Sequence, residues 1–237
     1  MKKILTILLF SISTHSIAFA DTRIVIDSYD GKSSIWLNDK YIRMSFKDSN
    51  PQGDNPGPPG DMIANFSSGK SYMIIDKTKT LVDTSTPPMM FGAMMPKKSE
   101  HKIIKATYKN KGPGKTISGL KTTQYEVSIQ GRKCFDMLLT KNQAYASAMK
   151  KIDSLHDDAG DFESICDQIN EQVDIEANEK YGYPVKSITA DGKLEMLVVA
   201  FKTNVKAPAK YLSFPSGYKI KTMTQIMQEE MAKQFPQ

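Results

Sequence analysis

The sequence predicts an α+β protein built on a strongly curved antiparallel sheet, with an inserted α-helical hairpin and a C-terminal helix. In the first half, short runs alternate apolar and polar residues between Gly, Pro and Asn turns, which is typical of antiparallel strands. Residues 142–175 change to steps of three and four residues, which predicts the helical hairpin. The last third returns to strands and ends in a weakly amphipathic helix over residues 222–234.

The N-terminus predicts export. Two lysines precede a short apolar run, and Ala18-Phe19-Ala20 is a small-residue cleavage signal, so residues 1–20 are expected to be a signal peptide cut after Ala20. Residues 21–237 then form a single domain in the periplasm or outside the cell. No apolar run approaches the roughly 20 residues that span a bilayer, so we expect no transmembrane segment, and peripheral contact with the envelope stays open.

The first half predicts a meander of short strands. Its strands are expected at residues 22–29, 34–37, 41–46, 62–66, 72–76 and 81–83, followed by 102–108, 121–130 and 133–140. Between the third and fourth strands, residues 47–60 are rich in Pro and Gly and predict a flexible surface loop. The acids Asp48, Asp54 and Asp61 lack the spacing of a calcium loop, which disfavours a calcium site.

The helical hairpin has two predicted arms. In the first arm, Ala144, Ala148, Ile152 and Leu155 share one face of a helix over residues 142–155. Asp161 is placed to cap the second arm. The apolar residues of this arm recur at steps of three and four: Phe162, Ile165, Ile169 and Val173. Strands at 183–189 and 193–203 follow, joined by an Asp-Gly turn that predicts a hairpin.

Two cysteines are present, Cys134 and Cys166. In an oxidising compartment an even pair favours a disulfide, and two buried free thiols are the alternative. A bridge would fasten the second helix of the hairpin to the sheet. A catalytic thiol is poorly supported, because neither His101 nor His156 is adjacent in sequence.

The charge pattern predicts a solvated surface. The formal charge is +6, but Lys and Asp or Glu residues are interspersed, so an anionic envelope surface is only the alternative partner. Basic and aromatic residues do not interleave as in nucleic-acid binding proteins, and we expect no nucleic-acid partner. No G-x-S-x-G, H-E-x-x-H or phosphate-loop motif occurs, so we expect neither an enzyme nor a cofactor. A hydrolase that uses two separated carboxylates stays open, because it needs no contiguous motif.

Four segments carry a family resemblance. They are ISGLKTTQYEV (117–127), KCFDMLLT (133–140), YGYPVKSI (181–188) and YLSFPSGYKI (211–220). Together they resemble the bacterial family known as domain of unknown function 4412, which is similar in turn to the LolA, LolB and RseB group of periplasmic lipoprotein-binding folds. The resemblance implies a half-open β-barrel facing helices. Where members often carry a cysteine after the lysine of the first segment, this chain has Thr122, so the family's usual bridge does not apply.

The matching residues are expected to determine the fold. Gly119 and Gly217 lie where a strand bends or turns, and a left-handed backbone costs glycine little. Pro215 precedes Gly217 in a turn, and Phe214 and Tyr218 flank it as core anchors.

The resemblance also implies a function: an exported, non-enzymatic binding protein that holds a lipid, a lipoprotein or another apolar ligand in a hydrophobic cleft. The stretch PPMMFGAMMP is expected to form an adaptable lid over it, because methionine repacks easily around varied ligands. Its lid residues are Met89, Met90, Phe91, Met94 and Met95.

Two alternatives stay open beside the apolar ligand. One is a structural or protein-interaction module without a small ligand. The other is Cu(I) binding by the four methionines of the lid, because thioethers are soft ligands. Plain core filling by the same residues is the structural alternative to a lid.

Overall fold

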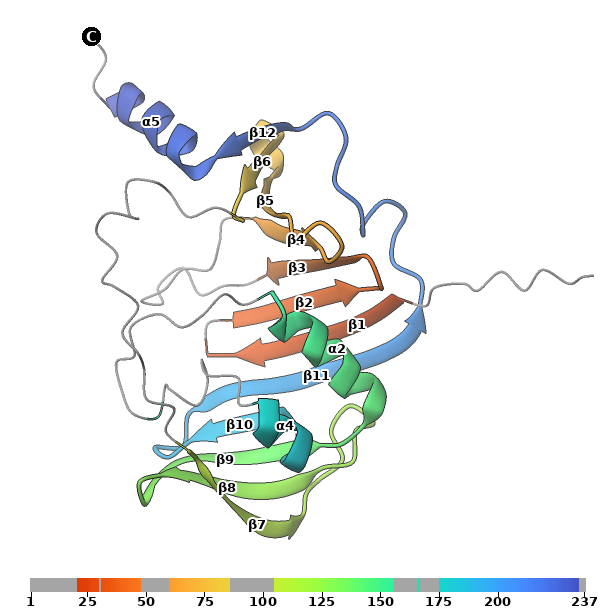
Figure 1. Ribbon diagram of the computed structural model, residues 1–237, viewed down its shortest axis with the longest axis vertical. Coiled ribbons are helices and arrows are strands. Elements are labelled where there is room, and N and C mark those ends of the chain that lie inside the picture. Colours follow the sequence, from red (N-terminus) through yellow and green to blue (C-terminus); the bar gives the residue numbers. More distant parts are fainter. Residues whose placement is uncertain are drawn as a thin grey trace, which may run out of the picture.

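The computed structural model describes residues 21–29, 31–47, 60–85, 105–155, 166 and 175–234 (Figure 1). A single twelve-stranded curved sheet runs through them in the order β12-β6-β5-β4-β3-β2-β1-β11-β10-β9-β8-β7. Its two outermost strands, β12 and β7, do not pair with each other, so the sheet is unclosed. The prediction of a purely antiparallel sheet is wrong at one place, because β12 pairs with β6 in parallel.

Half of the sheet is an N-terminal meander in which each strand pairs with the next one along the chain. Its strands are β1 (Asp21–Ser28), β2 (Gly31–Leu37), β3 (Tyr41–Lys47), β4 (Asp61–Asn65), β5 (Ser71–Ile75) and β6 (Thr80–Asp83), with a 3-10 turn η1 (Asp76–Thr78) before the last. Asparagine side chains build two of its turns. Asn38 Oδ1 accepts hydrogen bonds from the backbone N–H groups of Lys40 and Tyr41, and Asn65 Oδ1 accepts two in the same way.

Five of the six remaining strands form a second meander, from the part of the chain that follows the first. Its strands are β7 (Thr107–Pro113), β8 (Thr123–Ile129), β9 (Arg132–Thr140), β10 (Tyr183–Thr189) and β11 (Leu194–Val205). The two meanders meet where β1 pairs with β11, for example at Ile24 and Phe201. We call this central pair the seam.

Two helices lie between β9 and β10 in the chain, in front of the sheet in Figure 1: α2 (Gln143–Asp153) and α4 (Ile175–Tyr181). Helix α2 begins at Asn142, whose side chain accepts a hydrogen bond from the Tyr145 backbone N–H. Its buried residues are Tyr145, Ala148 and Ile152. Ala144, expected on this face, is exposed, and the neighbouring Tyr145 is buried instead.

The second arm of the hairpin was predicted to begin at Asp161. Except for Cys166, this arm lies outside the described residues. Helix α4 begins where that arm was expected to end. The bridge between Cys134 and Cys166 is confirmed, with a Cα–Cα distance of 5.4 Å, and it fastens the segment between the two helices to β9.

After β11, residues 206–218 form a segment that we call the strap. In Figure 1 it runs from the end of β11, inside the sheet, along one side to the sheet edge and delivers the chain to β12 (Lys219–Thr222). Because β12 arrives after this long crossing rather than from a hairpin, it can run parallel to β6.

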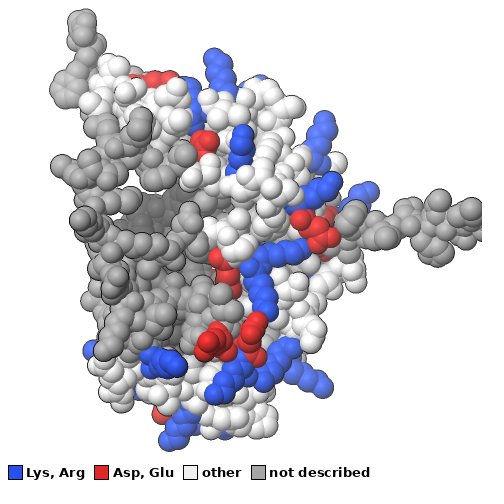
Figure 2. All heavy atoms as spheres, in the orientation of Figure 1, with Lys and Arg blue, Asp and Glu red and all other residues white. Residues whose placement is uncertain are grey.

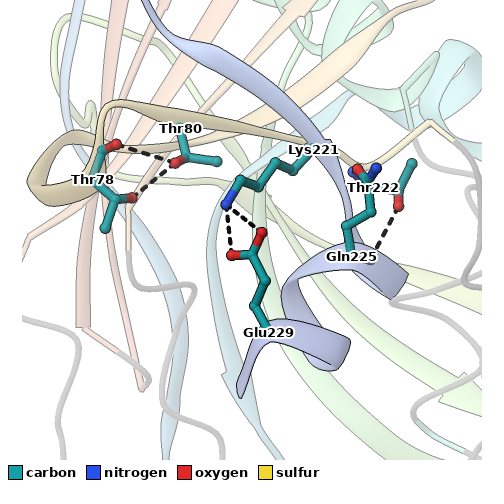
Figure 3. Close-up of polar contacts among 6 residues, drawn as sticks. All are labelled: Thr78, Thr80, Lys221, Thr222, Gln225 and Glu229. Atoms are coloured by element: carbon teal, nitrogen blue, oxygen red, sulfur yellow. Dashed lines mark hydrogen bonds and ion pairs between the residues drawn. The ribbon is translucent and has the colours of Figure 1, made fainter. Parts of the chain in front are cut away.

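Helix α5 (Met223–Gln234) follows β12 directly and starts with a capping box. Thr222 Oγ1 accepts a hydrogen bond from the Gln225 N–H, and Gln225 Oε1 accepts one from the Thr222 N–H (Figure 3). Lys221 forms an ion pair of 2.6 Å with Glu229 across the same junction (Figure 3). The strand and the helix are therefore tied together at the sheet edge.

Alternation along the strands separates two faces of the sheet. The helix face carries the largest core cluster, in which Tyr145 and Ile152 of α2 meet Ile24, Ile35 and Val198 of the strands. A second cluster around Phe135 continues on this face over β7 to β9. The opposite side, the strap face, carries a third cluster formed by Ile63, Tyr72, Ile74 and Leu81. Charged residues of both signs lie side by side over the surface seen in Figure 2.

Candidate binding surface on the helix face

Three methionines lie side by side on the helix face. Met44 of β3 is the cross-strand partner of Met62 of β4, and Met62 is the partner of Met73 of β5. We call these three residues the methionine row. Each of them is only partly buried, whereas Ile35 and Val82, which continue the row at its two ends, are buried.

Strand alternation explains why the row faces this side. On β3, Ile42 and Met44 point to the helix face and Ile42 joins the core cluster under α2, whereas Tyr41 packs against the strap-face cluster. Phe46 and Ile75 lie two positions from Met44 and Met73, so they point to the same face, and they are also partly exposed. The row is thus part of a wider, partly exposed apolar surface over β3 to β5.

This surface can bind an apolar group without polar chemistry. Methionine has an unbranched, polarizable side chain that adapts to irregular shapes. Burial of an acyl chain contributes about 0.8 kcal/mol per methylene, so shape and apolar area are sufficient for affinity.

A hollow of about 490 Å³ lies between α2 and α4; we call it the helix-pair groove. Lys150 and Glu179 form an ion pair of 2.9 Å between the two helices. Gly182 adopts a φ of 107° beside the groove, and a Cβ there would lie 2.5 Å from the Thr140 carbonyl oxygen. Only glycine lets α4 return to the sheet this closely. The remaining lining residues are Lys141, Gln143, Ala146, Ser147, Asn178 and Tyr183.

Tyr183 gives the groove a polar floor. Its side chain is buried, with 3% of the residue exposed. Burial raises the pKa of Tyr183, and the negative charge of Asp153 raises it further while Lys150 opposes the shift. The hydroxyl therefore stays neutral at physiological pH and is available as a donor.

The residues expected to form the lid, Met89, Met90, Phe91, Met94 and Met95, lie outside the described residues. The expected fold determinants are described, and they lie away from the methionine row. Gly119 and Gly217 both have a φ of 80°, in the left-handed region. Phe214 and Tyr218 of the strap, on either side of Pro215, pack on the strap-face cluster.

The methionine row was not predicted, although the sequence contains the signal for it. Each methionine stands in a different short strand, in YIRMSF, DMIAN and SYMII, two positions from another residue of the same face. Alternation alone assigns each to one face. Only the register between strands shows that they are neighbours.

Within the described residues, no three His, Cys, Asp or Glu side chains come together as metal ligands. No helix in the same ranges combines the length and the apolar character needed to cross a bilayer.

Comparisons with known proteins give only distant structural neighbours. No family model and no curated protein matches the chain, so the resemblance to domain of unknown function 4412 stays a prediction. The crystal structure of MucB is similar with a TM-score of 0.38 and 10% identity, over 84% of this chain and 58% of that one. The complex of Pseudomonas aeruginosa MucA and MucB gives 0.40 and 11%, over 86% and 58%.

A structure of PNGF-II gives a TM-score of 0.41 and 10% identity, over 90% of this chain and 32% of that one. The chain therefore spans less than two thirds of the length of each of these neighbours.

Proposed function

We propose that this chain is an exported, non-enzymatic binding protein of the cell envelope, and that it holds a lipid, a lipoprotein or another apolar ligand on its helix face. The sheet acts as a half-open barrel in this proposal, and the ligand lies over the methionine row. The observation that carries the proposal is the alignment of Met44, Met62 and Met73 as partly exposed cross-strand neighbours.

Two physical points support an apolar ligand here. The row lies on strands β3 to β5, and Phe46 and Ile75, each two positions from a methionine of the row, add partly exposed apolar side chains on the same face. Its side chains are flexible thioethers rather than branched residues locked in one rotamer, which suits ligands of variable shape. The predicted lid at residues 87–96 would add further methionines to the same ligand.

Native mass spectrometry of the protein purified from the periplasm tests this proposal. We expect a co-purified lipid that is released on denaturation, and an intact mass that begins at Asp21. In Met62→Glu a carboxylate enters the row, and we expect at least a tenfold loss of lipid uptake. Met231→Glu is the matched control, because Met231 is 54% exposed on α5 and lies outside the row. Equal uptake by the two variants, or none by the wild type, would reject an apolar site at the row.

A protein segment in the helix-pair groove is the second candidate, and the polar side chains of Gln143, Asn178 and Tyr183 that line the groove favour it. A neutral donor beside the side chains of Gln143 and Asn178 suits the amides of an extended peptide. Ser147→Trp would fill the groove. Selection of a displayed peptide library on the wild type should enrich peptides that do not bind Ser147→Trp. Lipid uptake by Ser147→Trp at the methionine row should equal that of the wild type.

Cu(I) binding is the third candidate, and it depends on Met89, Met90, Met94 and Met95, which lie outside the described residues. Titration with Cu(I) in the presence of a chromophoric competitor would decide it.

A further inference from the structure

The strap face carries a row of basic residues across the seam. Lys202 of β11 is the cross-strand partner of Arg23 of β1, Arg23 is the partner of Trp36 of β2, and Trp36 is the partner of Arg43 of β3. Cross-strand partners point to the same face with Cβ atoms about 5 Å apart. Three cations and one indole therefore stand in a line.

Within the ranges that the structure describes, only one of these three cations has an acidic partner. Arg43 donates to Asp61 Oδ2 from Nε at 2.8 Å and forms an ion pair of 2.6 Å through its terminal nitrogen. Its guanidinium also lies 4.2 Å from the ring centre of Tyr211, a residue of the strap. The Arg43 charge is thus neutralised and covered.

No described acid compensates the charges of Arg23 and Lys202 in this way. The Arg23 guanidinium lies 5.4 Å from the ring centre of Trp36, and its Nε is buried without a hydrogen-bond partner among the described residues. A buried donor left unpaired costs about 1–3 kcal/mol. Like charges directly opposite on paired strands are also destabilising. The unpaired donor of Arg23 and the repulsion between Arg23 and Lys202 therefore destabilise the same part of the sheet.

The acids of the same strand face do not remove these costs. Asp21 accepts hydrogen bonds from Asn38 Nδ2 at 3.3 Å and from the Ala207 N–H at 2.7 Å, so its carboxylate is engaged with the turn and the strap. Asp27 is four residues from Arg23, about 13 Å along a strand, which is too far for contact. An anion from outside the chain would satisfy both cations.

We propose that Arg23 and Lys202, with Trp36 as one wall, form a binding site for a phosphate group. Two adjacent positive charges match a phosphate, which carries about −1.5 to −2 charges at neutral pH when it is a monoester. The two terminal nitrogens of the arginine can donate parallel hydrogen bonds to its oxygens. The site lies on the opposite face from the methionine row, so it stands independently of the proposed function.

Titration of the full mature chain tests the site with two probes. Inorganic phosphate represents a free ligand, and vesicles of phosphatidylglycerol, compared with phosphatidylcholine, represent a lipid headgroup. We expect Lys202→Gln to weaken binding at least fivefold, and because Lys202 is exposed this variant should fold as the wild type does. Arg23→Lys should weaken it similarly, since it keeps the charge and loses the fork.

Lys121→Gln is the matched control, because it removes the same charge from an exposed position in the segment between β7 and β8. Binding of inorganic phosphate that depends on Lys202 supports the site with a free phosphate as ligand. Binding of phosphatidylglycerol vesicles alone, again dependent on Lys202, supports it with a headgroup as ligand. The proposal is overturned if neither probe binds, or if Lys202→Gln and Lys121→Gln bind equally.

Discussion

At the scale of single residues, Tyr145 joins α2 to the sheet. It is fully buried, its hydroxyl donates a hydrogen bond of 2.8 Å to the Pro184 carbonyl oxygen, and its ring meets Phe201 edge-to-face at 5.3 Å. Helix α2 and strands β10 and β11 therefore converge on one phenol. Burial raises the pKa of Tyr145 far above its ordinary value of about 10, and the charge of Asp153 acts in the same direction.

This shift predicts a loss of stability at alkaline pH. The folded state keeps the phenol neutral, whereas the unfolded chain ionises near pH 10, so the stabilisation is complete below that pH and falls as pH rises above it. Tyr183, whose pKa is also raised, adds to the same trend. We expect the free energy of unfolding to fall less steeply above pH 10 in Tyr145→Phe than in the wild type, as measured by urea unfolding at several pH values.

The same variant should lose about 1 kcal/mol at pH 7, because the Pro184 carbonyl loses its donor. Tyr29→Phe is the control, since Tyr29 is 64% exposed and its substitution should leave the pH profile unchanged. If the free energy of unfolding of Tyr145→Phe fell with pH above pH 10 as steeply as that of the wild type, ionisation of Tyr145 would not cause the loss of stability at alkaline pH.

At the scale of elements, the disulfide holds the α2–α4 connection on the sheet. Cys134 is in β9, and Cys166 packs against the second cluster of the helix face, as Tyr181 of α4 does. The bridge closes a loop with a sequence separation of 32 residues that contains all of α2. Helix α2 of the helix-pair groove therefore lies within a covalently closed loop.

Reduction should therefore destabilise the chain by about 3–4 kcal/mol, according to the loop-entropy relation for a loop of this length. Urea unfolding with and without reductant measures this difference. The double variant Cys134→Ala, Cys166→Ala should unfold at a midpoint near that of the reduced wild type and should not respond to reductant. A midpoint in the wild type that reductant leaves unchanged would contradict a stabilising role for the bridge.

The local sequence pattern was sufficient to predict most strands and α2, because strand alternation and helix caps depend on residues that are close together in the sequence. The strands of the first meander lie within a few residues of their predicted positions. Strand β12 was not predicted, since the four residues Lys219–Thr222 have no periodicity and pair only because the strap carries them to β6. The methionine row and the Arg23–Lys202 pair were not predicted for a related reason: both are set by register between strands, which no local window contains.

At the scale of the whole molecule, the sheet has two free edges and both are protected. On β7, Lys109 and Lys111 are exposed and the strand ends at Pro113. On β12 the strand is short and its last N–H is used by the Gln225 side chain. Charged, short or proline-ended edges discourage pairing with another chain. We therefore place binding on the faces of the sheet and not on its edges.

Replacing both edge lysines with valine should allow β7 to pair with the edge strand of another molecule. In Lys109→Val, Lys111→Val the edge gains two residues of high strand propensity and loses both charges, including the ion pair of 2.8 Å between Lys111 and Glu126. We expect self-association at concentrations where the wild type shows none, as measured by light scattering after size exclusion. Lys121→Val, away from either edge, should behave as the wild type, and equal masses for all three proteins would contradict edge protection.

The seam has a consequence for the order of events during folding. Every strand pair within the two meanders joins segments that follow one another along the chain, whereas β1 and β11 join residues near opposite ends, such as Ile24 and Phe201. Distant pairings of this kind close large loops and are formed slowly. A chain that emerges from a ribosome or a translocation pore N-terminus first can complete the β1–β2 hairpin early, but β1 keeps an unpaired edge until residues 194–205 have emerged. During that interval β1 is the part of the sheet most open to capture by a chaperone or by another chain.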